Sequence, residues 1–261
     1  NTVEQIGAGN RVAVNLAGVD HTDVKRGDAV IEPGRWRLTE RFDASLRVLD
    51  ALDHDVSRRG AYVAYIGAGE HAVKLRVLGV QELGPGTTGA VRLFLPAALP
   101  LLPGDRFVLR ESGRDETVGG GEVLDIDPVL RASRAAPDRS VERLVRERGW
   151  LTVDQIEQLT GEVVDPVIGE WVTTSEALAE LGAAIVERVD EAGPAGLDLA
   201  AFNERERAVL PALDAVVVSN GLVQPADAVD PYEDHPALAD LLAGGFTPPS
   251  LGDVDRNDLR E

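Results

Sequence analysis

The stretch Pro103-Gly-Asp-Arg-Phe-Val-Leu-Arg110, followed by Thr117-Val-Gly-Gly-Gly-Glu-Val-Leu124, decides the fold of the first half of the chain. Polar and apolar residues alternate along Arg106–Arg110, which is typical of a strand with one buried and one wet face. A second strand is predicted at Gly121–Leu124. The glycines Gly119–Gly121 permit unusual backbone dihedrals or the close approach of another backbone.

The same alternation recurs upstream of this stretch. Five further segments are predicted as strands: Arg11–Leu16, Ser45–Leu49, Ala61–Ile66, Val73–Leu78 and Ala90–Leu95. Turn-forming clusters separate them, among them Gly67-Ala-Gly69, which we expect to be a hairpin turn. Short strands at this spacing predict an antiparallel β-barrel. Pro33-Gly34 interrupts the pattern and marks a domain boundary.

After Asp127-Pro128 the period of the apolar residues becomes helical. Helices are predicted at Arg139–Arg148, Thr152–Thr160, Ser175–Ala192 and Asn203–Val216. Capping boxes are predicted for Thr152 with Gln155 and for Thr173 with Glu176, where each side chain satisfies a backbone N–H of the first turn.

Short helices followed by a small apolar strand recur in this half, at Val163-Val164 and at Val216–Val218 before the hairpin signal Asn220-Gly221. This layout is typical of tandem winged helices. The predicted fold class is therefore a multi-domain chain, with an antiparallel β-barrel followed by α+β winged-helix units. We place the barrel at residues 34–128 and the winged helices at 129–174, 175–232 and 233–261, the last one truncated.

The formal net charge of −19 argues against a protein that coats nucleic acid. The charge is unevenly distributed, because residues 1–130 carry a net −4 and residues 131–261 a net −15. The chain has no cysteine, which excludes disulfides and thiolate metal sites. No apolar run is long enough to cross a bilayer, so we expect a cytoplasmic protein without a membrane partner. Both ends of the chain are expected to be truncations.

Several segments resemble the selenocysteine-specific branch of the translational GTPases. Gly9–Val19 followed by Asp23–Asp28 is similar to the end of the family's second domain, and Pro103–Leu124 is similar to the closing strands of its third barrel. Trp150–Val153, Gly169–Val172 and Phe246–Ser250 resemble its winged-helix region. The resemblance implies that residues 1–33 end a domain 2 barrel, that 34–128 form domain 3, and that the intact factor delivers selenocysteinyl-tRNA to the ribosome in a GTP-dependent way.

No Gly-x-x-x-x-Gly-Lys-Ser/Thr phosphate loop occurs in the sequence. We therefore predict no enzyme activity and no cofactor for this chain, with GTP and magnesium expected only with the family's N-terminal GTPase domain. The four histidines show no zinc spacing, so no metal site is predicted, and we expect solvated loop histidines. The resemblance implies that the selenocysteine-insertion mRNA hairpin is bound by a C-terminal part that this chain lacks.

Arg11 is the candidate for the aminoacyl pocket, because relatives of elongation factor Tu carry an uncharged residue at the matching position. A selenol is mostly selenolate at neutral pH, so a guanidinium can favour it over the neutral hydroxyl of serine. The alternative is that Arg11 pairs with Glu4, Asp20 or Asp28 on the barrel rim.

A second group of candidates lies where the family's third barrel meets the T-arm of tRNA. Its members are Arg106, Arg110, Arg114, Thr117, Gly119, Gly120 and Gly121. Arginines and backbone amides bind phosphates without reading sequence, as suits an RNA helix recognised by shape and charge. The alternative is that Arg106 and Arg110 are simply the wet face of a strand.

Among the six arginines within residues 131–148, Arg139, Arg143 and Arg146 fit ordinary i,i+3 and i,i+4 helix pairs, which is the favoured reading, although RNA contact stays open. The acidic segment after residue 149 is expected to be a spacer, since phosphate binding needs Lys and Arg. The alternative function is a winged-helix DNA-binding regulator with a β-barrel sensor. Asp154 and Glu157 in an otherwise uncharged predicted helix argue against it. A hydrolase is also considered, but no nucleophile with a base is apparent.

Overall fold

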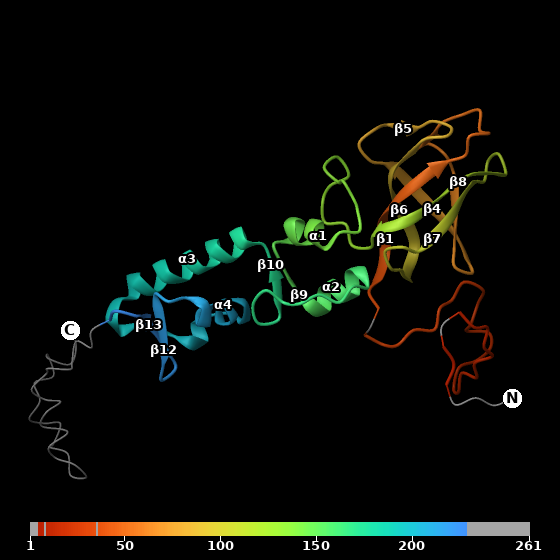
Figure 1. The fold of residues 1–261 in the computed structure, drawn as a ribbon. Helices are drawn as coiled ribbons and strands as arrows, with labels where there is room; N and C mark the ends of the chain where they lie inside the picture. Colours follow the sequence, from red (N-terminus) through yellow and green to blue (C-terminus); the bar gives the residue numbers. More distant parts are fainter. Residues whose placement is uncertain (1–4, 8, 35, 229–261) are drawn as a thin grey trace, which may run out of the picture. The chain divides into compact units, whose positions relative to one another are not determined.

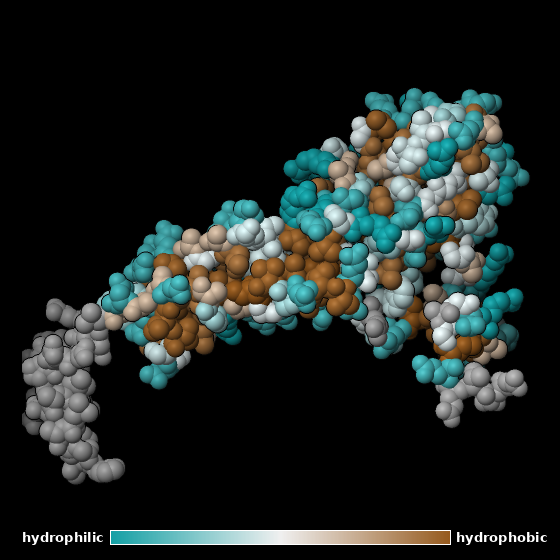
Figure 2. All heavy atoms as spheres, in the orientation of Figure 1, coloured by the Kyte–Doolittle hydropathy of each residue, from teal (hydrophilic) through white to brown (hydrophobic). Residues whose placement is uncertain are grey.

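The computed structural model describes residues 5–7, 9–34 and 36–228 (Figure 1). The described residues form two compact units. The first contains the described residues up to Arg139 together with Gln158–Gly161, and the second contains Ser140–Glu157 and the described residues from Glu162 onward. On the face seen in Figure 2, hydrophilic side chains predominate over the first unit. No helix among the described residues has the length and apolar character needed to cross a bilayer.

The first unit is a closed six-stranded barrel in which all neighbouring strands are antiparallel. Its strands are β1 (Leu38–Val48), β3 (Tyr62–Ile66), β4 (Gly69–Val77), β6 (Thr88–Pro100), β7 (Arg106–Glu111) and β8 (Glu116–Asp125). They close in the order β1-β6-β4-β3-β7-β8, and the short strands β2 (Val56–Ser57) and β5 (Glu82–Leu83) pair separately. The structure thus confirms the predicted antiparallel barrel.

Alternation along each strand divides the barrel into an apolar interior and a wet exterior. In β7 the side chains of Phe107 and Leu109 are buried, whereas Arg106 and Val108 are exposed. The Phe107 ring meets the Phe42 ring of β1 edge to face, with 6.0 Å between centroids. Burying such rings supplies the main favourable free energy of a small barrel.

The three glycines of β8 allow the barrel to close. Gly121 pairs with Leu46 of β1 on one side and with Phe107 of β7 on the other. A Cβ added at Gly121 would collide with the Ser45 carbonyl oxygen and would lie 2.7 Å from the Phe107 ring. Of the two readings of these glycines, close backbone approach is the one observed, since none of them has a positive φ.

A buried ion pair lies on the outer face of the barrel. Arg92 of β6 donates from Nε and Nη2 to the two carboxylate oxygens of Asp43 in β1, at 2.6 and 2.8 Å. Its Nη1 donates to the Leu130 carbonyl at 3.0 Å. Both partners are at least 94% buried, so this bidentate pair is shielded from water. It attaches the segment after β8 to the barrel wall.

The second unit alternates helices with short strands. The helices are α1 (Val141–Arg148), α2 (Val153–Thr160), α3 (Ser175–Ala192) and α4 (Glu204–Val209). The strands β9 (Trp150–Thr152) and β10 (Trp171–Thr173) form one sheet, and β11 (Leu197–Asp198), β12 (Val216–Ser219) and β13 (Leu222–Pro225) form another in the order β11-β13-β12. Short 3-10 helices at Gly193–Ala195, Leu199–Ala201 and Leu210–Ala212 connect them.

The core of the second unit follows from the apolar face of α3. Ile185 and Val189 pack with Phe202, Val209 and other buried residues, which are Leu210, Val216 and Val223. The guanidinium of Arg205 lies 5.2 Å and 5.3 Å from the ring centroids of Trp150 and Trp171, respectively. The second unit thus has a mainly aliphatic core, and a cation–π contact connects α4 to the sheet of β9 and β10.

The turn and cap predictions are mostly confirmed. Thr152 and Gln155 form the predicted reciprocal cap, at 3.0 and 3.2 Å. Asn220-Gly221, with φ of 49° and 80°, turns β12 into β13 as the hairpin signal predicts. The cap of α3 was predicted one residue too early, because Thr174 caps Ala177, whereas the Thr173 hydroxyl donates to the Gly149 carbonyl.

Three predicted elements are wrong. Arg11–Leu16 has no regular secondary structure, because it has no ladder partner among the described residues and its side chains alternate without a face to bury. Val163-Val164 is not a strand either, and the strand of this region is β10. The helix predicted at Asn203–Val216 ends at Val209, since Pro211 cannot continue it. The domain boundaries and the winged-helix assignment stay predictions, and residues 229–261, with the third unit, lie outside the described residues.

The close approach at Gly121 predicts that Gly121→Ala destabilises the barrel by about 1–3 kcal/mol or more, because the methyl group has to push two strands apart. Gly113→Ala is the matched control, since a Cβ there meets no heavy atom within 4 Å. Its effect should stay within about 0.5 kcal/mol. Scanning calorimetry, which separates the unfolding of the two units, measures both changes. Equal stability of the two variants would contradict the role given to Gly121.

Candidate functional site

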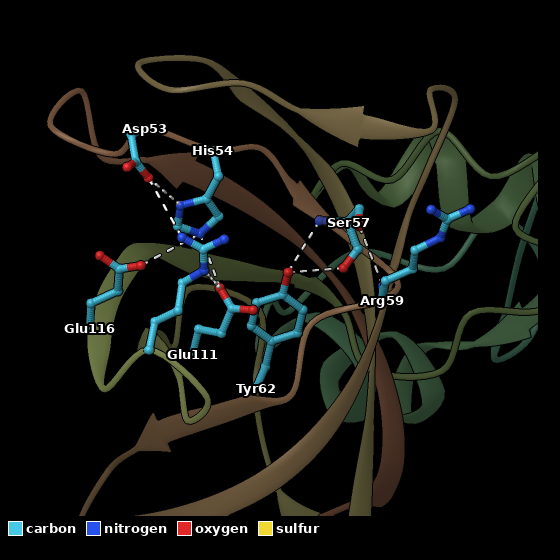
Figure 3. Close-up of polar contacts among 8 residues, drawn as sticks. Asp53, His54, Ser57, Arg59, Tyr62, Glu111 and Glu116 are labelled. Carbon is cyan, nitrogen blue, oxygen red and sulfur yellow. Dashed lines mark hydrogen bonds and ion pairs between the residues drawn. The ribbon is translucent and has the colours of Figure 1, made fainter.

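A cluster of charged side chains joins the hairpin between β7 and β8 to the loop that follows β1. It consists of Arg114 together with Asp53, His54, Glu111 and Glu116, and is called the rim cluster below. Figure 3 labels the last four. Asp53 and His54 come from the loop before β2, Glu111 ends β7, and Glu116 begins β8. Antiparallel pairing places Glu111 opposite Glu116, so two carboxylates face the loop from one hairpin.

His54 is the centre of the rim cluster. Its Nδ1 lies 3.1 Å from Asp53 Oδ1, and its Nε2 lies 3.0 Å from Glu111 Oε2 and 3.6 Å from Glu116 Oε1. Carboxylates accept hydrogen bonds and do not donate them, so both ring nitrogens are best satisfied when both carry a proton. The imidazole is only 17% exposed. The geometry therefore favours an imidazolium held between carboxylates.

The electrostatics of the rim cluster agree with this geometry. The hydrogen bond to Asp53 and a second one to Glu111 raise the pKa of His54 above its ordinary value of 6.5, while partial burial and the nearby Arg114 oppose the shift. The pKa of Asp53 is lowered, mainly by its hydrogen bond with His54. Arg114 approaches Asp53 at 3.7 Å and Glu111 at 3.9 Å. These contacts place the Arg114 guanidinium beside the histidine.

The donor atoms of His54, Glu111 and Glu116 lie within 4.8 Å of one another, a spacing that would suit a divalent cation. A metal needs an unprotonated ring nitrogen and an approach clear of other cations. Here the ring favours the protonated form and Arg114 lies alongside, so the residues fit an ion-pair network better than a metal site. The predicted lack of a metal site stays a prediction.

A second small network holds the turn next to this cluster. The Tyr62 hydroxyl accepts from the Ser57 backbone N–H at 3.1 Å and donates to the Ser57 carbonyl at 2.9 Å (Figure 3). Burial raises the pKa of the Tyr62 phenol. The phenol therefore stays neutral and fixes the turn that carries Arg58 and Arg59.

The structure brings together three of the candidate residues. Arg110, Arg114 and Thr117 share the hairpin between β7 and β8. Arg110 is not free there, because its Nη2 donates to the Asp115 carbonyl at 2.9 Å and to Asp115 Oδ1 at 2.8 Å. Arg106 lies at the other end of β7, opposite Glu122. Gly119, Gly120 and Gly121 lie in the ladder between β1 and β7, where packing accounts for them.

Arg11 lies apart from this hairpin in sequence and in secondary structure, in an exposed segment without helix or strand. Within the described residues it makes no ion pair. Of its three alternative partners, Asp20 bonds to Thr22 and His21, and Asp28 accepts from the Lys25 backbone. Glu4 lies outside the described residues.

The sequence did not single out Asp53, His54, Glu111 or Glu116. The expectation of solvated histidines is wrong for His54, which is largely covered, and holds for His21, whose side chain is 93% exposed. His235 lies outside the described residues. The one available signal was the placement of Glu111 and Glu116 on either side of a tight hairpin, and its histidine partner comes from 57 residues away.

Comparison with known proteins agrees with this architecture. A protein-family model described as the β-barrel domain of the selenocysteine-specific elongation factor matches residues 44–129. The selenocysteine-specific elongation factor of Desulfomicrobium baculatum is 29% identical over 118 residues, which cover 45% of this chain and 19% of that relative. Elongation factor Tu 2 of Streptomyces avermitilis is 33% identical over 135 residues, covering 48% of this chain and 33% of that relative. The chain therefore spans about a fifth to a third of these relatives.

A solved structure supports the fold. The crystal structure of a bacterial selenocysteine-specific elongation factor, EF-Sec, aligns with a TM-score of 0.55 at 18% identity, covering 81% of this chain and 38% of that one. At 18% identity, this similarity supports the fold and nothing further.

The rim cluster predicts a pH-dependent contribution of His54 to barrel stability. Because the folded-state pKa is raised, this contribution is fully present below the unfolded pKa of about 6.5 and is lost as pH rises through the folded value. His54→Gln should therefore lower the barrel melting temperature most at about pH 5–6 and least in alkali. His21→Gln is the matched control and should leave the melting temperature unchanged. A His54→Gln effect that is constant across the pH range would refute this account.

Proposed function

We propose that this chain, whose residues 44–129 match the family model of the β-barrel domain of the selenocysteine-specific elongation factor, holds selenocysteinyl-tRNA during its delivery to the ribosome. The family match of the barrel is the observation that carries the proposal. The proposed setting is the cytoplasm, where translation takes place. In the whole factor GTP and Mg²⁺ are expected to act outside residues 1–261, since these contain no phosphate loop.

The hairpin between β7 and β8 is the proposed contact with the T-arm of the tRNA. Arg114 and Thr117 are exposed on it, and ion pairs with Asp53 at 3.7 Å and with Glu111 at 3.9 Å orient the Arg114 guanidinium. A guanidinium oriented in this way can bind a phosphate bidentately. RNA helices present phosphates and 2′-hydroxyls more readily than base edges, so the contact would recognise shape rather than sequence.

Arg11 is the proposed selenium-sensing residue. It is exposed and has no acidic partner in the described part of the chain, so its positive charge is available for a ligand. A selenolate would accept hydrogen bonds from the guanidinium, whereas the neutral hydroxyl of serine would gain less.

The second unit is the proposed linking arm. In residues 175–225 a helix, a short strand, a second helix and a hairpin follow one another, as in a winged helix. Within α2, Asp154 and Glu157 are the charged residues, so this unit suits a spacer better than a phosphate-binding surface. Binding of the selenocysteine-insertion mRNA hairpin is proposed for the whole factor, through a part outside this chain. A DNA-binding regulator is not favoured, because the family match concerns a translation factor.

The tRNA contact is tested by Arg114→Gln in the full-length factor. Loss of one phosphate contact should weaken retention of selenocysteinyl-tRNA by up to about tenfold. It should also reduce the slope of log K against log salt concentration by about 1. Arg47→Gln, a charge change on an exposed part of β1, is the matched control. A filter-retention assay with GTP measures both. Equal losses in the two variants would remove the hairpin from the tRNA interface.

The pocket role is tested by Arg11→Gln and Arg11→Lys in the same factor. Arg11→Gln should reduce the preference for selenocysteinyl- over seryl-tRNA, and Arg11→Lys should restore part of it, because the charge returns without the planar fork. Arg26→Gln, an exposed residue of the same segment, should leave the preference unchanged. An unaltered preference in Arg11→Gln would exclude a selenium-sensing role.

A further inference from the structure

The outer face of β4, β6 and β1 carries cations around an exposed aromatic ring. In the ladders, Lys74 of β4 and Arg41 of β1 both pair with Phe94 of β6. Residues directly opposite in antiparallel strands present their side chains on the same face. Phe94, which is 36% exposed, therefore lies between two exposed cations. In the closed order of the six strands, β6 is the strand farthest from β7, so this face lies on the other side of the barrel.

The next row of the same face adds a third cation. Arg76 of β4 pairs with Arg92 of β6, which pairs with Asp43 of β1. The Arg92 charge is compensated by Asp43, but Arg76 remains exposed. The positive charge that this row presents to solvent is therefore that of Arg76. The row thus adds one exposed cation that an external anion can reach.

A groove runs along this face. It is lined by Arg41, Arg76, Arg92, Phe94 and residues 128–133, and the lining contains no acidic residue. The Arg41 Nη2 donates to the Pro128 carbonyl at 3.3 Å, and Arg92 holds the Leu130 carbonyl, so the segment is fixed against the barrel. This attachment brings the exposed Arg131 to the groove.

The exposed cations of this face lack acidic partners among the described residues, whereas some other surface arginines of the barrel have them. Arg47 is paired with Asp50, and Arg110 with Asp115. By contrast, the four exposed cations of this face, which are Arg41, Lys74, Arg76 and Arg131, make no ion pair within the part of the chain that the structure describes. In a chain with a net charge of −19, such a group of uncompensated cations favours a polyanionic partner.

We propose that this face binds single-stranded RNA, with Arg41, Arg76, Arg131 and Lys74 contacting phosphates and one unpaired base stacking on Phe94. An acidic peptide would match the charges, but it would gain little from an aromatic platform between them. Bases stack on such rings regardless of sequence, and arginines alongside strengthen the contact. This surface is separate from the hairpin proposed to contact the T-arm, so each of the two proposals can be refuted without affecting the other.

The test measures binding of a fluorescent single-stranded RNA oligomer to the 261-residue chain at low salt. Arg41→Gln with Arg76→Gln should reduce the salt slope by about 1.4, because two single-strand phosphate contacts are lost. Phe94→Leu should weaken binding at least about fivefold without changing that slope. Arg47→Gln with Arg59→Gln makes the same charge change at exposed positions elsewhere on the barrel and should have little effect. Circular dichroism checks that every variant is folded.

Competition arms distinguish the partners. Unlabelled single-stranded RNA should displace the probe better than duplex RNA of the same length or polyglutamate. The proposal is overturned if Arg41→Gln with Arg76→Gln binds RNA as tightly as the parent, or if its matched control loses as much. It is also overturned if duplex RNA or polyglutamate competes equally well, or if Phe94→Leu leaves the affinity unchanged, since the face would then recognise charge alone.

Discussion

Strand β8 closes the barrel only by bringing its backbone into close contact with β1, and the glycines at 119–121 make that approach feasible. A side chain at Gly121 would meet the Ser45 carbonyl and the Phe107 ring at once. Closure places β7 and β8 side by side and directs their hairpin toward the loop that carries His54. The position of the rim cluster therefore depends on a steric constraint in the strand beside it.

The barrel combines two kinds of charge arrangement. Asp43 and Arg92 are buried and bidentate, so removing one partner would leave a buried charge uncompensated at a large cost. The rim cluster is partly covered, with 17% of the His54 side chain exposed, and its members are paired with one another. The cations around Phe94 are exposed, so their charges are available for ligands. The rim cluster orients one arginine between carboxylates, whereas the Phe94 face leaves its cations without acidic partners.

Local patterns predicted much of the fold. The period-2 alternation identified each barrel strand, although β1 and β6 are longer than predicted, because their ends are stabilised by ladders that a local pattern does not show. The bounds predicted for α3, Ser175–Ala192, are those observed. Alternation alone was not sufficient at Arg11–Leu16, because an alternating segment becomes a strand only where a neighbouring strand pairs with its backbone.

The candidate site was less predictable than the fold. Arg110, Arg114 and Thr117 are close in sequence, and a resemblance was enough to group them. His54 meets Glu111 across 57 residues, and Lys74, Phe94 and Arg41 meet only through the strand register. Sequence spacing does not reveal such contacts, because they depend on the order in which the strands close.

The central claim is that the barrel holds the tRNA through the hairpin between β7 and β8. Hydrogen–deuterium exchange of the full-length factor, with GTP and with or without selenocysteinyl-tRNA, tests it most directly. The account predicts slower exchange on tRNA binding in residues 110–117, with little change in residues 197–225. Unchanged exchange in the hairpin, or protection confined to residues 197–225, would contradict it.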